Sequence, residues 1–272
     1  MGLLGETKPV KKPILGVSLY PEQETMEEIE NYLTMASQYG FTKIFTSMFS
    51  VPGTKEEVFD YFKNFCDLAH KHGMKVSGDC NTAFFKKMGA SESDISIFKE
   101  MGIDIIRMDL PYFDQRDVTL INNPYNITIE LSSCMIQAVR MALENGANPK
   151  NFSTCHNFYP ERYTASDLES IRSINKELFS LGIPSAVFIS SNEENTHGPW
   201  PVHDGLPTVE DHRWIPAELQ VRHWIAVGDV DEIIFGNAFA SEEEFKAIDQ
   251  VMKEAYVDIP RFEGQEFLAE LL

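Results

Sequence analysis

Three carboxyl side chains, Asp79, Asp109 and Glu130, lie at or near the ends of short β-branched segments and are well suited to acid–base chemistry. Cleavage of a glycosidic bond needs two carboxyl groups across a small gap. One protonates the leaving oxygen, and the other acts as nucleophile or activates water. Each carboxyl could instead form a structural salt bridge, and Asp109, two residues beyond Arg107 on the same strand face, is open to that interpretation. As a group, the three predict catalysis.

The run CHNFYP at residues 155–160 is the densest group of chemically versatile side chains. We expect His156 to lie at the open end of a strand, where it would serve as acid, base or hydrogen-bond donor to a substrate. The alternative is a histidine bonded to a neighbouring loop. Cys155 is expected to pack and not to react, because nothing nearby would lower its thiol pKa.

Other polar side chains near strand ends are expected to bind a substrate. These are Ser18, Tyr20, Arg107, Asn157, Tyr159, Arg162, Arg213 and Asn237. Arg162, Arg213 and the backbone beside Asn237 are candidates for holding a phosphate, because barrel enzymes often bind one in that region.

The segment 191–216 is longer than an ordinary connection and contains His197, Trp200, His203, His212, Arg213 and Trp214. Its length predicts a lid or a substrate-binding loop. Its histidines do not have the spacing of a metal motif, so we expect neither a metal nor an organic cofactor.

Eight strands are expected to position these residues. The segments are 14–19, 43–48, 75–79, 104–109, 127–131, 152–156, 185–190 and 232–236. Between them, amphipathic helices are expected at 25–39, 56–72, within 113–122 and at about 242–255. Capping-box pairs mark helix starts at Thr25 and Glu28, Thr54 and Glu57, Ser166 and Glu169, and Ser241 and Glu244. Glycines suited to left-handed caps follow the helices at Gly40, Gly73, Gly102, Gly146, Gly182 and Gly228.

This alternation predicts an α/β protein of the (β/α)₈ barrel class, essentially complete and without a full second domain. A doubly wound open sheet is the alternative, but no GxGxxG or GxxxxGK[ST] motif follows any strand. We expect an N-terminal lead at 1–12, the barrel at 13–257, and a tail at 258–272 that would be the stub of a second domain.

Composition limits the partners. Lys and Arg number 23 against 42 Asp and Glu, a net charge of −19, which argues against nucleic acid or an anionic membrane surface. The four cysteines form no CxxC pair, and no signal-peptide core or 18-residue apolar run occurs. The sequence therefore predicts a cytoplasmic protein.

The chain resembles the bacterial 6-phospho-N-acetylmuramidases across nearly its whole length. The matching segments are GVSLYP at 16–21, RMD at 107–109, CHNFYP at 155–160, and His212-Arg213 ahead of Pro216. The resemblance implies an intracellular glycosidase that releases 6-phospho-N-acetylmuramic acid from N-acetylglucosamine in peptidoglycan recycling. Its substrate would be a phosphorylated amino-sugar disaccharide, and no cofactor is implied.

Two other functions stay open. A barrel lyase or isomerase of sugar phosphates is one, although no lysine ends a strand to form a Schiff base, since Lys43 and Lys75 lie at strand starts. The other is a non-catalytic protein that binds a sugar phosphate or serves as a surface interaction partner. Fold alone does not separate them, because barrels host many chemistries.

Overall fold

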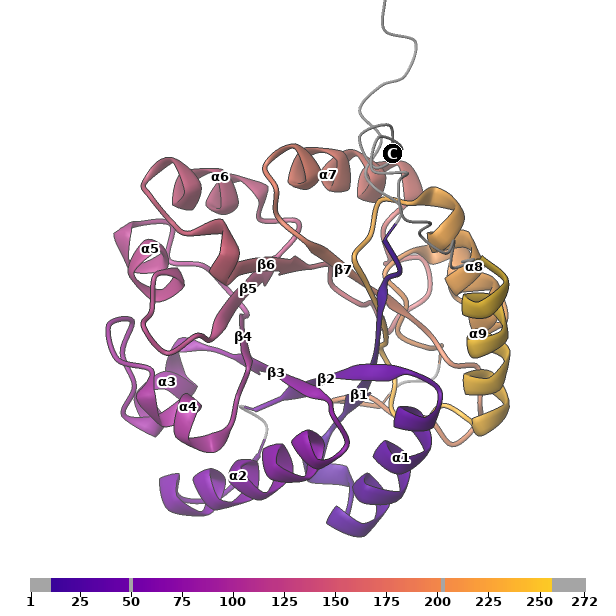
Figure 1. The fold of residues 1–272 in the computed structure, drawn as a ribbon, viewed down its shortest axis with the longest axis horizontal. Coiled ribbons are helices and arrows are strands. Elements are labelled where there is room, and N and C mark those ends of the chain that lie inside the picture. Colours follow the sequence, from indigo (N-terminus) through magenta and orange to yellow (C-terminus); the bar gives the residue numbers. More distant parts are fainter. Residues whose placement is uncertain (1–10, 49–50, 202–203, 256–272) are drawn as a thin grey trace, which may run out of the picture.

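The computed structural model describes residues 11–48, 51–201 and 204–255. Eight parallel strands form a closed barrel in which β1 pairs with both β2 and β8 (Figure 1). The strands are β1 (Ile14–Leu19), β2 (Phe41–Ser47), β3 (Lys75–Cys80), β4 (Ile105–Met108), β5 (Thr128–Ser132), β6 (Phe152–Cys155), β7 (Ser185–Ile189) and β8 (Glu232–Phe235). Each overlaps a predicted segment, with β2 beginning two residues earlier than expected, and the predicted (β/α)₈ barrel is confirmed.

Helices surround the barrel on its outer side (Figure 1). They are α1 (Met26–Gln38), α2 (Lys55–Lys71), α3 (Thr82–Met88), α4 (Ser96–Met101), α5 (Gln115–Ile121), α6 (Ile136–Glu144), α7 (Leu168–Ser180), α8 (Ala217–Val227) and α9 (Glu242–Ala255). The short helix predicted within 113–122 is α5. The expected C-terminal tail, most of the N-terminal lead and His203 lie outside the described residues.

The sequence signals at the helix ends are largely confirmed. Thr25 and Thr54 each form a complete capping box with the glutamate three residues later. Ser241 and Glu244 exchange the same two hydrogen bonds ahead of α9. The prediction for Ser166 is wrong by one residue, because the carboxylate of Asp167 accepts from the first-turn amide of Ser170 and begins α7. A carboxylate caps as well as a hydroxyl, so the adjacent aspartate can take the position.

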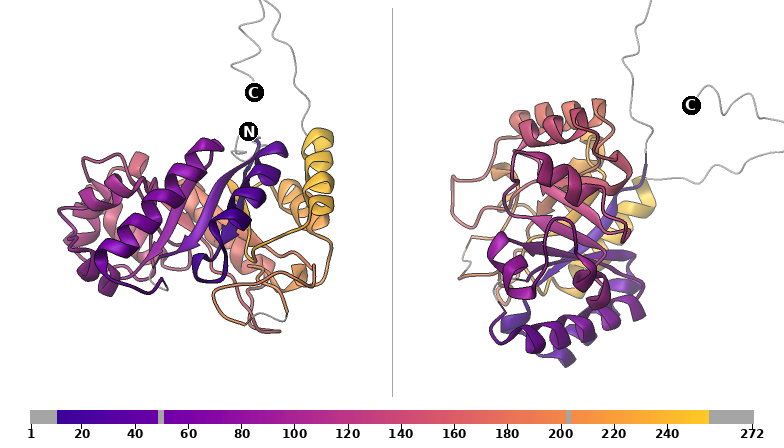
Figure 2. Two further views of the ribbon diagram at one scale, coloured as in Figure 1. Left: turned by 90° about the horizontal axis from the view of Figure 1, so that it is seen from below. Right: turned by 90° about the vertical axis from the view of Figure 1, so that its left-hand side faces the viewer.

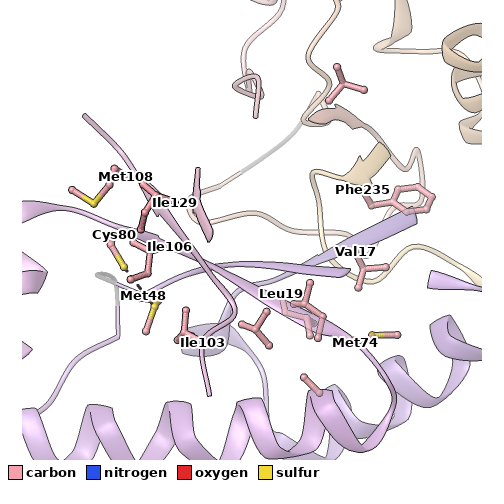
Figure 3. Packing of buried hydrophobic residues seen from close by; sticks show 14 of the residues in the cluster. Val17, Leu19, Met48, Met74, Cys80, Ile103, Ile106, Met108, Ile129 and Phe235 are labelled. Carbon is pink, nitrogen blue, oxygen red and sulfur yellow. Dashed lines mark hydrogen bonds between the residues drawn. The ribbon is translucent and has the colours of Figure 1, made fainter. Parts of the chain in front are cut away.

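The apolar core has two layers. The larger lies between the strands and the helices and includes Val17, Met48, Cys80 and Ile106 (Figure 3). The smaller lies inside the barrel and contains Tyr20, Phe45, Cys155, Ala186, Phe188, Ile234 and Ala238. The rings of Phe45 on β2 and Phe188 on β7 meet edge to face at 5.2 Å between centroids, which places both in the barrel interior because these strands are not neighbours.

The two ends of the barrel differ. At the N-terminal ends of the strands a cavity of about 590 Å³ is lined by residues that include Lys43, Lys75, Ser153 and Glu232. At the opposite end, the long segment between β7 and α8 projects beyond the strands and appears in orange at the lower edge of the left view of Figure 2. We call the end at which the strands finish the mouth. Active sites of (β/α)₈ barrels form there.

Candidate active site

A buried ion pair forms the centre of the mouth. Nη1 of Arg107 on β4 donates to Oδ1 of Asp79 on β3 at 2.8 Å. The two residues are register partners on adjacent strands, so their side chains leave the sheet on the same side. Burial raises the pKa of the Asp79 carboxyl, and the guanidinium of Arg107 opposes part of that rise. Asp79 therefore holds its proton more tightly than an ordinary aspartate.

Amide and hydroxyl groups extend this pair across the mouth. Nη2 of Arg107 donates to Oδ1 of Asn157, which follows β6, at 2.7 Å. The hydroxyl of Ser132, at the end of β5, donates to the same oxygen at 3.1 Å. Strands β3, β4, β5 and β6 thus contribute to one connected polar group, in which the guanidinium is fixed from two sides.

Asp109 lies beside this group in a different environment. It follows β4, its backbone N–H donates to the carbonyl of Cys80 at 2.9 Å, and its side chain is exposed. Across the described ranges, its carboxylate has no hydrogen bond or ion pair with another side chain. Its negative charge is one of those that raise the pKa of Asp79. The mouth therefore has one buried, proton-retaining carboxyl and one solvated carboxylate, an arrangement that separates acid and base roles.

Glu130, the third predicted carboxyl, lies deeper in the barrel. Its side chain is 1% exposed, and Oε2 accepts from Nζ of Lys43 at 2.8 Å. The hydroxyl of Ser77 approaches Oε1 at 3.4 Å. The structure thus corrects its expected place at the rim, because Glu130 is in mid-strand and is enclosed by residues from β2 and β3.

His156 does not point into the mouth, contrary to expectation. Its Nε2 is 2.8 Å from Oδ1 of Asn175 on α7, so the ring lies between the barrel and a helix. Burial lowers its pKa from 6.5 to about 4. The neighbour Asn157 is the residue of this pair that reaches the mouth, since adjacent extended residues point to opposite sides. The predicted catalytic role of His156 has no support in this geometry, which matches the alternative of a bonded, structural histidine.

Ser18 and Tyr20 close the seam between β1 and β8. The hydroxyl of Ser18 donates to the carbonyl of Phe235 at 2.6 Å, and that of Tyr20 to the carbonyl of Gly236 at 2.5 Å. Both residues are fully buried, and burial raises the pKa of the Tyr20 phenol. Both hydroxyls donate their protons to backbone carbonyls of the β8 end, so in this structure Ser18 and Tyr20 stabilise the junction of β1 and β8.

Arg213, a predicted phosphate ligand, is fully enclosed by protein acceptors. Its Nε and Nη2 donate to Glu210, both at 2.7 Å, and Nη1 donates to the carbonyls of Tyr159 and Asp204 at 2.9 and 3.0 Å. The side chain has 0% exposure. Arg213 therefore ties the segment after β7 to the one after β6. The backbone of Tyr159 contributes to this connection twice: its carbonyl accepts from Arg213, and its N–H donates to the carbonyl of Pro207.

Asn237 is also used structurally. Its Oδ1 accepts from the N–H of Ser191 at 2.9 Å, and its Nδ2 donates to Ser191 and Thr196 at 2.9 and 2.7 Å. The same long segment crosses closely over β8, because a Cβ at Gly236 would collide with the carbonyl oxygen of Leu206. Of the phosphate candidates, Arg162 has an exposed guanidinium, paired with Asp204 at 2.9 Å.

Aromatic rings connect the barrel interior to the mouth. Phe158 packs on Phe188 at 4.8 Å and on Phe45 at 5.9 Å between ring centroids. Trp200, from the long segment after β7, lies over Phe158 at 6.0 Å and is 47% exposed. We call Phe45, Phe188, Phe158 and Trp200 the aromatic column. It presents a half-exposed indole at the mouth.

Sequence reasoning missed several residues that the structure brings to this site. The sequence predicts Lys43 at a strand start, but β2 begins at Phe41 and the Lys43 ammonium lies inside the barrel. Ser132 lies two residues after Glu130, so strand alternation would have placed it at the mouth. Glu24 accepts from His197 at 2.9 Å and anchors the long segment to the end of β1, and no local pattern indicates such a contact.

No group of three or more His, Cys, Asp or Glu side chains in the described ranges could hold a metal ion. In the same ranges, no helix is both long and apolar enough to cross a membrane. The polar groups that the structure brings together at the mouth include two carboxyls, a guanidinium, an amide and the hydroxyl of Ser132.

Comparison with solved structures gives similar chains. An uncharacterized B. cereus protein is 36% identical, with a TM-score of 0.78, over 88% of this chain and 65% of its own. A conserved Enterococcus faecalis protein of unknown function is 22% identical, with a TM-score of 0.76, over 89% of this chain and 66% of its own. The chain therefore spans about two thirds of the length of each. A Thermotoga maritima DAHP synthase, 17% identical with a TM-score of 0.55, shares the fold alone.

A comparison with curated proteins found no match. A family model described as "6-phospho-N-acetylmuramidase, N-terminal" matches residues 15–250, which include the whole barrel apart from Ile14 and the end of α9. Because this match covers most of the chain, the protein belongs to the 6-phospho-N-acetylmuramidase N-terminal family.

Proposed function

We propose that the protein hydrolyses the glycosidic bond between 6-phospho-N-acetylmuramic acid and N-acetylglucosamine, with Asp79 and Asp109 as its carboxyl pair. The observation that carries this proposal is the contrast between these two carboxyls at the mouth of a barrel of this family. Glycosidases need such a pair, one member protonated and the other ionised.

Asp79 would act as the acid. Its raised pKa keeps a proton available for the leaving oxygen, and its contact with Arg107 fixes the carboxyl. Asp109, which is exposed, would attack the anomeric carbon or activate a water molecule. The separation of the two carboxyls in the substrate complex decides between these routes. Arg107, itself fixed by Asn157, would hold the acid in place.

The surroundings of the pair suit a phosphorylated sugar. The indole of Trp200 offers an apolar face against which a sugar ring could pack, and such mixed apolar and polar linings are typical of small-molecule sites. Arg162 has the exposed guanidinium and would bind the 6-phosphate in place of its present partner Asp204. Such a local cation is required because the chain has a net charge of −19.

The proposed setting is peptidoglycan recycling in the cytoplasm. The cysteines at 66, 80, 134 and 155 are all free thiols, which suits a reducing compartment. The substrate would accordingly be a disaccharide already phosphorylated inside the cell.

The test is release of N-acetylglucosamine from the 6-phosphorylated muramyl disaccharide, with the unphosphorylated disaccharide as control. Turnover restricted to the phosphorylated form is expected. Calorimetric binding of the phosphorylated form without turnover would instead indicate a sugar-phosphate sensor. Turnover of both forms at equal rates would refute the phosphate specificity.

A further inference from the structure

A series of alternating charges runs through the barrel interior from the cavity at the N-terminal end to the mouth. We call it the interior charge series, and its members in order are Glu232, Lys43, Glu130, Arg107 and Asp79. Asp79, Arg107 and Glu130 are register partners on β3, β4 and β5, so their side chains lie next to one another on the inner face.

Lys43 forms the lower half of this series. Its Nζ lies 2.8 Å from Glu130 and 2.5 Å from Glu232, and its side chain is 3% exposed. Burial by itself would lower the pKa of Lys43, but the two carboxylates raise it and the net shift is upward, so the ammonium keeps its charge. Lys43 belongs to β2, Glu130 to β5 and Glu232 to β8, so the three groups meet across the barrel.

Arg107 forms the upper half and has two possible anionic partners. Its register neighbour Glu130 would be an obvious acceptor, yet the guanidinium donates to Asp79 and Asn157. Within the described part of the chain, the buried Nε of Arg107 has no acceptor. Glu130 instead binds Lys43 through Oε2, while the guanidinium of Arg107 turns to the residues at the mouth.

We propose that Lys43 is a positioning residue: by binding Glu130 it keeps Arg107 on Asp79, and so it sets the protonation of the acid at the mouth. This inference rests on the proposed role of Asp79. Without Lys43, Glu130 would be an unpaired buried carboxylate, and its register partner Arg107 on β4 is the cation placed to compensate it. Asp79 would then lose its counter-charge.

The direction of the effect follows from the groups that face Asp79. These are Arg107 and Asp109 from β4 and its following segment, Glu130 from β5, and the neutral phenol of Tyr20 from β1. The neighbour on β2, Ser47, has no charge. Burial raises the pKa of Asp79, the two carboxylates raise it further, and Arg107 alone lowers it. Weakening the Arg107 contact must therefore raise this pKa.

The experiment is a pH titration of Asp79 by NMR, with the side-chain carboxyl carbons of aspartate labelled with ¹³C and the signal assigned with Asp79→Asn. In Lys43→Met we expect the pKa of Asp79 to rise by about one unit or more. In Lys43→Met/Glu130→Gln, where the unpaired carboxylate is gone, it should return to or below the wild-type value. The matched control is Lys75→Met, because Lys75 is the register partner of Lys43 and lines the same cavity. It should leave the titration unchanged.

Glu130→Gln keeps Lys43 bound to Glu232 and provides a second readout if Lys43→Met does not fold. It should lower the pKa of Asp79, because one nearby negative charge is removed. A Lys43→Met protein with a lower Tm and an unmoved or lowered Asp79 pKa, or an unmoved pKa in Glu130→Gln, would overturn the proposal. The titration needs no turnover, so inactivity on the disaccharide would reject the proposed function and leave this inference to be decided separately.

Discussion

Arg107 donates from Nη1 to Asp79 and from Nη2 to Asn157, at 2.8 and 2.7 Å, so one guanidinium joins the ends of β3 and β6 across β4. Asp109, two residues farther along the chain than Arg107, stays outside this contact and faces solvent. The same few residues thus place one buried carboxyl with a raised pKa, Asp79, beside one exposed carboxyl, Asp109.

This arrangement predicts distinct pH effects for the two carboxyls. Asp79→Asn and Asp109→Asn should each lower kcat by about 10²- to 10⁴-fold. The acid must be protonated, so activity falls as the pH rises through the pKa of Asp79, and Asp79→Asn should remove that alkaline limb from the residual rate. Steady-state rates across pH 4 to about 9 measure both effects. Asp67→Asn, on the outer face of α2, is the control, and near-normal turnover in both active-site variants would contradict the assignment.

Trp200 is expected to contribute to substrate binding and not to chemistry. Trp200→Ala should raise KM by about 3- to 10-fold at nearly constant kcat, because the column would lose the indole over Phe158. Trp200→Phe should restore most of the affinity. Leu219→Ala, equally exposed on the outer side of α8, serves as control. A fall in kcat with unchanged KM would exclude the role in binding.

Arg162 is expected to discriminate the phosphorylated from the unphosphorylated disaccharide. Arg162→Met should reduce kcat/KM for the phosphorylated form by about 10-fold or more, since a charge-assisted contact to phosphate is lost. The unphosphorylated form should be little affected. Arg140→Met, on the outer surface and paired with Glu177, provides the comparison. Equal losses for both substrates would place the phosphate elsewhere.

His156 is expected to make the stability of the fold depend on pH. Its pKa falls from 6.5 to about 4 on folding, so the unfolded chain binds its proton more tightly. The neutral, buried His156 therefore stabilises the fold fully above pH 6.5. As the pH falls from 7 to 5, the free energy of unfolding should drop by about 2 kcal/mol because of this residue. In His156→Gln, the free energy of unfolding measured with urea should change by about 2 kcal/mol less between pH 7 and 5 than in the wild type. The kcat of this variant should stay close to the wild-type value. His72→Gln is the control, and an unchanged pH dependence in His156→Gln would contradict the burial argument.

Arg213 is expected to hold the long segment after β7 in place. Arg213→Met leaves Glu210 and two carbonyls without their donor and should cost about 3 kcal/mol or more of unfolding free energy. Arg222→Met breaks an exposed pair with Glu254 and should cost under about 1 kcal/mol. Urea denaturation measures both, and limited proteolysis should cut 191–216 faster in Arg213→Met alone. Equal stabilities would argue that Arg213 is free for a ligand.

The sequence by itself determined the fold. Eight apolar segments, separated by helices that end at glycine, leave little choice but parallel strands joined by crossovers, and such strands close into a barrel. It also identified Asp79, Arg107, Asp109 and Asn157 as residues of the mouth, because strand ends are readable from local pattern.

Only the tertiary structure decided which side of the barrel wall each residue faces. At β6 polar residues occupy consecutive positions, Ser153 with Thr154 and His156 with Asn157, so the phase of alternation there cannot be read from hydrophobicity. A shift of one position separates Asn157 at the mouth from His156 against α7. The same holds for contacts across the barrel: Lys43 and Glu130 are 87 residues apart, and Arg213 meets Tyr159 across 54. Local sequence has no information about such pairs, because closure of the barrel alone brings them together.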